Sequence, residues 1–420
     1  MIKLLGYISY IFGTQAYFLL VKFIAPYNKR AKLLIEAQHK AWQLIDKIPH
    51  QASDYTIWFH VSSLGEFEQG KPLMIALKEA MPQCKIIVSF FSPSGFLAKE
   101  KDSSADYIIY LPFESKKNAQ RFIQTIQPKL AIWVKYDFWH QYLYELNQQH
   151  IPVFLIAAQF RAKQVFFKKW AVFQRSTLAM FTHIFCQNQS SQNLLNQFNI
   201  TQHSLSGDNR YDRVKDYASN LEDIPYIEAF KNNTSTLILG SSYKEEESLL
   251  AYSLFKLSDP LKIIIAPHFV DEKRLAEIEE NFPHKTIRYS KVSDQTNFQE
   301  YTILIMDSIG FLARLYRYGD LALVGGGFWE NGLHNSLEPC AFGMPIAFGP
   351  KLRRFPEAQE LVDLGVASIV SHQKEFNDWL SKHILDEQLR KEKAFKCKQF
   401  VKEHAGATQR VMAVLSNYLS

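Results

Sequence analysis

The chain has 420 residues, of which 47% are hydrophobic and 21% are charged, and its formal net charge is +6. This length allows two globular domains, and the composition excludes a disordered or fibrous protein. The mild positive excess suits an anionic ligand or an anionic membrane surface and argues against a nucleic-acid-binding protein. The four cysteines are far apart and form no C-x-x-C pair, so a reducing compartment is expected, with no zinc site or disulfide framework: Cys84, Cys186, Cys340 and Cys397.

Residues 4–21 (LLGYISYIFGTQAYFLLV) form an apolar run without any charge. Its length is close to the minimum for crossing a bilayer. Because Ser9, Thr14 and Gln15 weaken it, a helix that lies in the membrane interface and a buried core helix stay open as alternatives. No small-residue cleavage site follows, so a removed signal peptide is not expected. The cations after the run predict that the bulk of the chain is cytoplasmic and contacts anionic head groups: Lys22, Lys29, Arg30 and Lys32.

Short apolar strands alternate with amphipathic helices along the chain, which predicts parallel sheets covered by helices on both faces. In the first half, strands are expected at 57–61, 85–90, 106–110, 130–134, 152–157 and 183–187, with helices at 71–81 and 117–127 among others. In the second half, strands are expected at 236–240, 262–266, 302–306, 321–325 and 345–348, with helices near 244–257, 271–280, 309–318 and 386–418.

The polar stretch 213–235 separates the two runs of strands and is expected to be a hinge. The predicted fold class is therefore α/β, with two Rossmann-like domains that face each other across a cleft. Ligands of such sheets bind at the carboxyl ends of the strands. The expected organisation is a membrane-associated segment at 1–30, Rossmann-like domains at 31–212 and 213–385, and a helix at 386–420 that packs back on the first domain.

The segment IWFHVSSLGEFEQG (57–70) predicts a buried strand, a tight turn and the start of a helix. Ser63 and Glu66 match a capping box, so a capping role and a catalytic role for Glu66 are both open on the local pattern. The glycine between them lets the chain turn sharply, which would place Glu66 at the edge of the cleft. Gly70 and Pro72 are expected to break or kink the helix soon afterwards.

In the second half, the stretch 323–350 (LVGGGFWENGLHNSLEPCAFGMPIAFGP) contains three consecutive glycines, Gly325 to Gly327. A helix is expected to begin near Asn335, with Asn335 or Ser336 as its N-cap. A Gly-rich loop before a helix N-terminus offers N–H groups to an anion, and Glu338 could accept hydrogen bonds from ribose hydroxyls. Alternatively, the glycines only form tight turns and Glu338 only complements the helix dipole.

Two other strand ends are expected to lie near this loop. Ser241 and Ser242 follow one strand, although Ser242 and Glu245 also match a capping box. His268 follows the next strand and could donate to a phosphate or simply be exposed. Since no D-x-D pair ends a strand, we expect chemistry that needs neither a metal nor a cofactor.

Nine motifs in this order give the chain its resemblance to a known family. They are HVSSLGEFEQGKPL (60–73), SPSG (92–95), LPFE (111–114), GDNRYD (207–212), GSSYKEEE (240–247), APH (266–268), MDSIGFLARLYRYGD (306–320), GGGFWENGLHNSLEPCAFGMPIAFGP (325–350) and GAT (406–408). With them the chain resembles the Kdo transferases, membrane-associated glycosyltransferases of the GT-B type. These move 3-deoxy-D-manno-octulosonic acid (Kdo) from CMP-Kdo to the lipid A precursor in lipopolysaccharide biosynthesis.

The resemblance implies that Glu66 is the general base and that Asp137 either orients Glu66 or binds the acceptor. It also implies a location on the cytoplasmic face of the inner membrane of a Gram-negative bacterium, at an anionic lipid surface. It implies no oligomeric state. The residues expected to bind CMP-Kdo are Ser241, Ser242, His268, Gly325, Gly326, Gly327, His334, Asn335, Ser336 and Glu338.

The chain departs from the family mainly on the acceptor side. KYDFWH (135–140) stands where the family has E-T-E-L-W-P, so Lys135 replaces the first glutamate and Asp137 the second. AAQFR (157–161) stands in place of N-A-R-L-S. Two other functions therefore stay open: another GT-B enzyme that uses a UDP-sugar, either a transferase or an epimerase, and a non-enzymatic membrane-bound scaffold.

Overall fold

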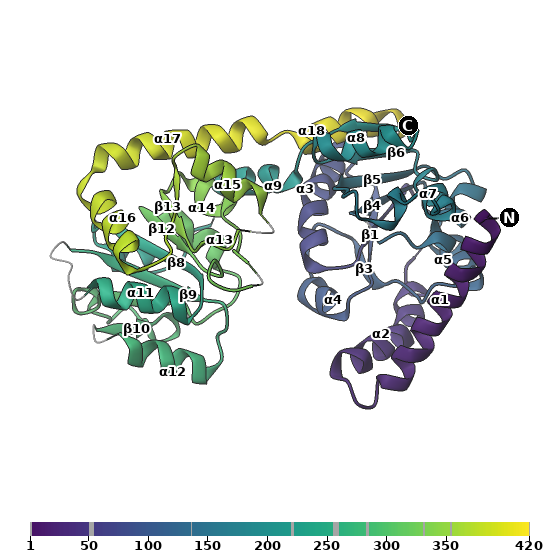
Figure 1. The fold of residues 1–420 in the computed structure, drawn as a ribbon. Helices are drawn as coiled ribbons and strands as arrows, with labels where there is room; N and C mark the ends of the chain where they lie inside the picture. The colour runs from purple at the N-terminus through teal and green to yellow at the C-terminus, as the bar shows by residue number, and fades with distance from the viewer. Residues whose placement is uncertain are drawn as a thin grey trace. The chain divides into compact units, whose positions relative to one another are not determined.

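A computed structural model describes residues 2–49, 54–135, 137–219, 222–254, 260–282, 285–330, 332–352 and 355–419. The chain forms two compact units, whose elements are labelled in Figure 1. Unit 1 comprises Met1–Arg213 and Ala405–Ser420, and unit 2 comprises Val214–His404. Each unit is built on one parallel sheet with helices between its strands. The predicted α/β class with two Rossmann-like domains is confirmed.

The sheet of unit 1 has seven strands in the order β3-β2-β1-β4-β5-β6-β7. Strands β1, β4 and β5 are buried along their whole length, as expected for parallel strands covered on both faces. The six predicted strands are found, whereas β7 (HSL) contains two polar residues and shows no apolar run. The strands are β1 (Thr56–Val61), β2 (Lys85–Phe90), β3 (Tyr107–Tyr110), β4 (Leu130–Val134), β5 (Val153–Ala158), β6 (His183–Cys186) and β7 (His203–Leu205).

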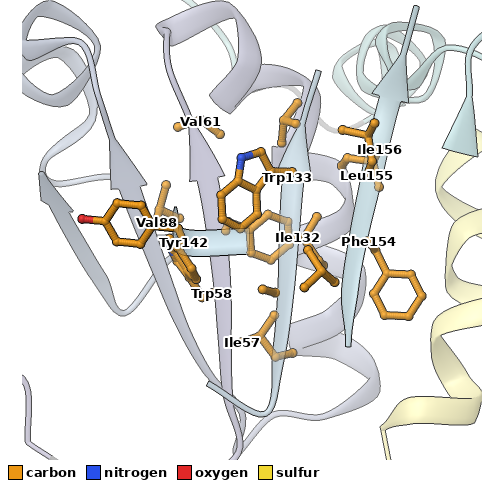
Figure 2. Packing of buried hydrophobic residues seen from close by; sticks show 14 of the residues in the cluster. Ile57, Trp58, Val61, Val88, Ile132, Trp133, Tyr142, Phe154, Leu155 and Ile156 are labelled. Carbon is orange, nitrogen blue, oxygen red and sulfur yellow. The ribbon is translucent and has the colours of Figure 1, made fainter. Parts of the chain in front are cut away.

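Large aromatic side chains fill the centre of this unit (Figure 2). Trp58 on β1 meets Trp133 on β4 edge-on, with ring centroids 4.8 Å apart. Tyr142 packs against Trp58 at 5.9 Å. The helices of this unit are α1 (Ile2–Ile24), α2 (Lys29–Ile45), α3 (Leu64–Ala80), α4 (Pro93–Lys99), α5 (Lys116–Ile126), α6 (His140–Gln148), α7 (Val172–Leu178), α8 (Gln189–Gln197) and α18 (Ala407–Leu415). Helix α9 (Asn209–Ser219) begins in unit 1 and ends in unit 2.

Helix α3 corrects one prediction. It begins at Leu64 and continues through Gly70 and Pro72 to Ala80, so neither residue ends it. A Cβ atom on Gly70 would lie 3.3 Å from Cγ2 of Val134. The glycine therefore lets the helix pack closely on the sheet, and this buried packing outweighs the low helix propensity of the two residues.

The sheet of unit 2 has the order β10-β11-β9-β8-β12-β13-β14. The five predicted strands are found, and the additional β10 and β14 have only three residues each. The strands are β8 (Thr236–Ser242), β9 (Lys262–Pro267), β10 (Thr286–Arg288), β11 (Ile303–Ile305), β12 (Leu321–Val324), β13 (Ile346–Phe348) and β14 (Ala367–Ile369). The helices are α10 (Ile227–Lys231), α11 (Lys244–Leu254), α12 (Glu272–Asn281), α13 (Leu312–Leu315), α14 (Leu337–Phe342), α15 (Pro356–Asp363), α16 (Gln373–Leu385) and α17 (Glu387–His404).

Two helical predictions in the second half need correction. The segment 309–318 contains only the four-residue α13 and a short 3-10 turn. The expected helix over 386–418 is two helices, α17 and α18, which are separated at Gly406. This glycine has φ +98°, a conformation that ends a helix and that L side chains rarely adopt. The hinge at 213–235 stays a prediction; the two units divide at its start, between Arg213 and Val214, and it contains the end of α9 and all of α10.

Both sheets have a point at which the strand order reverses. In unit 1 it lies between β1 and β4, and in unit 2 it lies between β8 and β12. The carboxyl ends of the strands at such a point diverge into a crevice that commonly holds the ligand. The loops after β1, β4, β8 and β12 are therefore the places where a site is expected, and they carry most of the predicted site residues.

Candidate functional site

Glu66 lies on the first turn of α3, directly after the turn that follows β1. The Oγ of Ser63 accepts a hydrogen bond from the Glu66 N–H at 3.3 Å. The Oε2 of Glu66 accepts one from the Ser62 N–H at 2.5 Å. The capping arrangement therefore forms: the Ser63 N–H also acts on the carboxylate, which accepts in addition from the residue before the cap. Glu66 is 9% exposed. Burial raises its pKa to about 7, although the hydrogen bond from the Ser62 N–H lowers it.

The loop after β4 brings two charges to the same edge of the sheet. Apart from burial, the negative charge of Asp137 raises the pKa of Glu66 and the positive charge of Lys135 lowers it. Lys135 has φ +67°, an uncommon conformation for a residue with a side chain. Burial lowers the pKa of Lys135, and the charge of Glu66 opposes this shift. Tyr136, between the two charged residues, lies outside the described residues.

Two tryptophans hold this loop in place. The indole N–H of Trp133 donates to the backbone oxygen of Asp137 at 2.9 Å. The indole N–H of Trp139 donates to Nε2 of His60 at 3.1 Å. Since burial lowers the pKa of His60 to about 3, its ring is neutral and Nε2 can accept. The sequence did not identify His60, because one histidine inside a strand gives no signal of its partner 79 residues away.

Further charges interact with Lys135 from other parts of unit 1. Asp208 and Arg210 form an ion pair, with Oδ2 and Nη2 2.7 Å apart. We refer to the resulting group of charges as the charged edge. It comprises Glu66, Lys135, Asp137, Arg161, Asp208 and Arg210.

In unit 2, the end of β8 carries Ser241 and Ser242. Ser241 has φ +53°, and the pairing of β8 with β9 shifts register at this point. Ser242 is 1% exposed, and its hydroxyl donates to Oε1 of Glu247 at 2.6 Å. The capping box of Ser242 with Glu245 does not form. Instead, the N–H of Tyr243, the residue before α11, donates to Oε2 of Glu246.

The glycines after β12 allow a close approach of backbone segments. A Cβ atom on Gly325 would lie 2.1 Å from the backbone oxygen of Ser241. The Gly325 N–H donates to the oxygen of Gly240 at 2.9 Å, and the His334 N–H donates to the oxygen of Gly325 at 3.1 Å. The Gly326 N–H donates to a carboxylate oxygen. Three N–H groups that were expected to face an anion are thus already used within the protein.

The helix after this loop begins close to the predicted position. It is α14, which begins at Leu337, and Ser336 stands at its cap position without a side-chain capping bond. Asn335 takes over this role, since its Oδ1 accepts from the Leu337 N–H at 3.1 Å. Its amide also donates to Oε1 of Glu338 at 3.0 Å. The Oγ of Ser336 is buried and has no hydrogen-bond partner among the described residues.

An aromatic pocket of about 460 Å³ lies beside the Gly-rich loop. The ring of Tyr243 is stacked on His268, with centroids 5.0 Å apart, and on His334 at 5.7 Å. The Tyr243 hydroxyl lies 3.2 Å from Nε2 of His334. Burial lowers the pKa of His334 to about 4 and also lowers that of His268, so both rings are neutral at pH 7. The lining residues are Tyr243, His268, Phe269, Gly326, Trp329, Gly332, Leu333, His334 and Phe355.

The sequence did not identify Glu246 as part of this region, because it is one of three consecutive glutamates at a helix start. It is fully buried. Its Oε1 accepts from the Gly326 N–H at 2.9 Å and its Oε2 accepts from the Tyr243 N–H at 3.1 Å. Burial raises the pKa of Glu246 to about 7. This carboxyl group joins the end of β8 to the Gly-rich loop.

No group of three or more His, Cys, Asp or Glu side chains suited to a metal ion occurs in the described part of the chain. Metal-independent chemistry stays a prediction. The site residues fall into two groups, one in each unit: Glu66 and Asp137 in unit 1, and the ten predicted donor residues in unit 2.

Residues 29–213 match the family model described as 3-deoxy-D-manno-octulosonic-acid transferase (kdotransferase). A 3-deoxy-D-manno-octulosonic acid transferase of Haemophilus influenzae is 25% identical over 378 residues, which are 86% of this chain and 87% of the relative. A bifunctional glycosyltransferase/methyltransferase of Fusobacterium nucleatum is 23% identical over 330 residues, or 76% of this chain. This chain spans about half (51%) of that relative's length.

Among solved structures, UDP-GlcNAc 2-epimerase from Neisseria meningitidis superposes with a TM-score of 0.58 at 14% identity. The match covers 86% of this chain and all of that chain (100%). At this identity the likeness concerns the fold alone. It agrees with the predicted GT-B type of fold, in which two Rossmann-like domains are joined in one chain.

Proposed function

Because the chain is related to the Kdo transferases over most of its length, we propose that it is an inverting, metal-independent glycosyltransferase that moves Kdo from CMP-Kdo to the lipid A precursor. The observation that carries this proposal is the position of Glu66. It is a buried carboxyl group with a pKa raised to about 7, at the point where the strand order of unit 1 reverses. A general base works best when its pKa lies near the working pH.

In the proposed reaction, a hydroxyl oxygen of the acceptor attacks the anomeric carbon of Kdo from the face opposite to CMP. A new C–O bond forms, and the bond from that carbon to the phosphate oxygen breaks, with its electron pair leaving on CMP. The hydroxyl proton passes to Glu66. The Ser62 N–H would hold the carboxylate in position through Oε2.

The other members of the charged edge would tune the base and bind the acceptor. Asp137 raises the pKa of Glu66 by its charge, which strengthens the base, so we assign Asp137 this role rather than a contact with the acceptor. Lys135 and Arg161 add positive charge at the same edge. Cations here suit a phosphorylated, anionic acceptor, although the family's usual glutamate is absent.

The donor would bind in unit 2, beside the Gly-rich loop. The aromatic pocket offers flat rings against which a nucleobase can stack. His268 and His334 would contribute neutral N–H donors to the CMP phosphate, because their lowered pKa values keep them uncharged. Glu338 would accept from the ribose hydroxyls. Three N–H groups of the loop already bind other parts of the protein. The side chains of His268, His334 and Glu338 would therefore contribute more to binding CMP-Kdo than the sequence indicated.

We place the protein at the cytoplasmic face of the inner membrane, where its lipid acceptor would be. Within the described residues, one helix is long and apolar enough to cross a bilayer, Lys3–Ile24, and only 11% of its apolar window is buried in the protein. This low burial argues against the alternative of a core helix. The membrane also supplies the anionic surface that the net positive charge suits.

One incubation tests the proposed function. The full chain is mixed with CMP-Kdo and a tetraacylated lipid A precursor, and the lipid is analysed by mass spectrometry. We expect Kdo to be added to the lipid with release of CMP, and we expect free CMP but not UDP to inhibit. Unchanged lipid together with inhibition by UDP would favour the UDP-sugar enzymes, and binding of CMP-Kdo without any product would favour the scaffold.

A further inference from the structure

One face of helix α1 is fixed to the rest of unit 1 by polar contacts. The Tyr10 hydroxyl donates to Oε2 of Glu114 at 2.6 Å and accepts from the His140 N–H at 3.2 Å. The side-chain amide of Gln141 donates to the Tyr7 hydroxyl at 3.2 Å. These bonds join the first part of α1 to the start of α6 and to the segment before α5.

Close aromatic packing accompanies these bonds. Phe18 is 5% exposed and is stacked on Phe113, with ring centroids 4.1 Å apart. The rings of Tyr7 and Tyr10 lie 5.8 and 5.5 Å from that of Phe173. A Cβ atom on Gly6 would lie 2.6 Å from Cβ of Phe173. The glycine therefore allows α1 to lie directly against α7.

A helix that crosses a bilayer would have to leave this seat. Glu114 is 3% exposed and uses both carboxylate oxygens, one for Tyr10 and the other for the Gln141 N–H at 2.6 Å. Departure of α1 would leave a buried acceptor without its donor, which is costly. It would also move the Tyr7 and Tyr10 hydroxyls into hydrocarbon, where polar groups need internal partners.

The opposite face of α1 is apolar and open. Its large side chains range from 41% exposed (Ile8) to 76% exposed (Phe23). An exposed set of large apolar side chains on one side of a helix is typical of an interaction site. Its members fall in two groups, toward the start and the end of α1, which lie on the same side of a helix with 3.6 residues per turn: Leu4, Leu5, Ile8 and Phe12, then Leu19, Leu20 and Phe23.

Positive charges border this apolar face. Residues 1–35 contain no acidic side chain. Helix α7 packs against the first part of α1, and the loop directly before α7 adds two lysines and a tryptophan that is 66% exposed. Cations beside an apolar face complement the negative head groups of an anionic bilayer. The exposed residues are Lys3, Lys22, Lys29, Arg30, Lys32, Lys168, Lys169 and Trp170.

From these contacts we infer that α1 lies in the membrane interface, seated on unit 1, with its apolar face in an anionic bilayer and both of its ends on the same side. It does not cross the bilayer. The inference deepens the membrane attachment in the proposed function and rests on it, but it uses none of the catalytic assignments. Its tests measure topology and lipid binding, so they can fail while Kdo transfer is confirmed.

Topology is tested by labelling single cysteines in cells. Lys3→Cys and Lys29→Cys place a thiol near each end of α1, and the four native cysteines are buried, so their background reaction should be low. Spheroplasts of a Gram-negative host are treated with a membrane-impermeant maleimide before and after permeabilisation. We expect both positions to react only after permeabilisation. Reaction of Lys3→Cys in intact spheroplasts, with Lys29→Cys protected, would show a spanning helix and overturn the inference.

Lipid binding is tested with vesicles of phosphatidylcholine, with and without phosphatidylglycerol. The full chain should sediment with the anionic vesicles, and the double variant Phe12→Glu/Phe23→Glu should bind at least about tenfold more weakly, because two phenylalanines no longer enter the bilayer. Phe395→Glu is the matched control, since Phe395 is 69% exposed on α17 of unit 2. Circular dichroism verifies that each variant is folded.

Two outcomes would contradict the lipid-facing assignment. Equal vesicle binding by the double variant and the wild type would show that this face does not contact lipid. A dimer in light scattering that the double variant loses, without any vesicle binding by the wild type, would assign the face to a second copy of the chain.

Discussion

The two sheet edges use buried carboxyl groups in different ways. In unit 1, Glu66 follows β1, and in unit 2, Glu246 follows β8, so the two occupy corresponding places beside the reversal of strand order. Burial raises the pKa of each to about 7. Glu246 accepts from a backbone N–H on each carboxylate oxygen. The carboxyl group of Glu66 interacts with the N–H groups of Ser62 and Ser63, and the charges of Asp137 and Lys135 act on it as well.

A raised pKa alone therefore does not identify a base in this molecule. Glu114 has a pKa raised to about 7 by burial as well, and it too has a donor on each oxygen. In Glu246 and Glu114 the carboxyl group holds segments of the fold together. Glu66 differs from both because its carboxyl group belongs to the charged edge, where Asp137 and Lys135 act on its pKa; this setting suits the proposed proton transfer from an acceptor hydroxyl.

The largest expected effect comes from Glu66→Gln. The amide oxygen can still accept from the Ser62 N–H, but it cannot take up a proton, so we expect Kdo transfer to slow by about 10²–10⁴-fold. Affinity for CMP-Kdo should not change, because the proposed donor site lies in unit 2. Single-turnover rates and calorimetric titration measure the two quantities separately.

The matched control for this variant is Glu79→Gln, an exposed glutamate on the same helix, which should leave both quantities unchanged. Near-normal turnover by Glu66→Gln would show that another group accepts the proton, and the contrast between Glu66 and Glu246 would then have no catalytic meaning.

A smaller effect, on stability rather than chemistry, is expected from Glu246→Ala. The change leaves the N–H groups of Gly326 and Tyr243 without their acceptor, and each buried, unsatisfied group costs about 1–3 kcal/mol. Thermal unfolding of unit 2 should shift down by roughly 2–4 °C for each kcal/mol lost, and CMP-Kdo should bind more weakly as the loop loosens. Differential scanning calorimetry measures the shift in the unfolding temperature.

Glu245→Gln is the control, because Glu245 is exposed and its amide oxygen can still accept from the Trp329 indole, which donates to it at 2.7 Å. If Glu246→Ala were as stable as this control, the carboxyl group of Glu246 would not join the end of β8 to the Gly-rich loop. The structural role assigned to it in the comparison with Glu66 would then be wrong.

The sequence predicts the long strands and the position of Glu66 because these depend on local patterns. Strands such as β1 and β4 are continuous apolar runs, and the turn before Glu66 has its own glycine. The strands β7 (HSL), β10 (TIR) and β14 (ASI) contain polar residues, so they lack the continuous apolar run that marks the equally short β11 (ILI) and β13 (IAF). Glu246 could not be recognised, since its burial depends on a glycine loop 80 residues further along the chain.

The same limit applies to the Gly-rich loop, whose turns could be predicted from the sequence but whose hydrogen-bond partners could not. Its glycines predict tight turns, and tight turns are present. Whether the N–H groups of Gly325 and Gly326 face a ligand or the protein depends on the end of β8, which approaches from a distant part of the sequence. The hydrogen-bond partners of these groups follow from tertiary packing, which no local pattern contains.

The most direct test of the central claim is the pH dependence of kcat/KM for Kdo transfer. Below its pKa Glu66 is protonated and cannot accept a proton, so the rate should rise by about tenfold per pH unit up to about pH 7 and then level off. His334 and His60, with pKa values of about 4 and 3, should not contribute to this rising part of the profile, which we call the acid limb. Glu246→Gln should keep the limb, and the residual rate of Glu66→Gln should lack it. A profile that is flat from pH 5.5 to 8, or a limb that survives in Glu66→Gln, would contradict the assignment of Glu66 as the base.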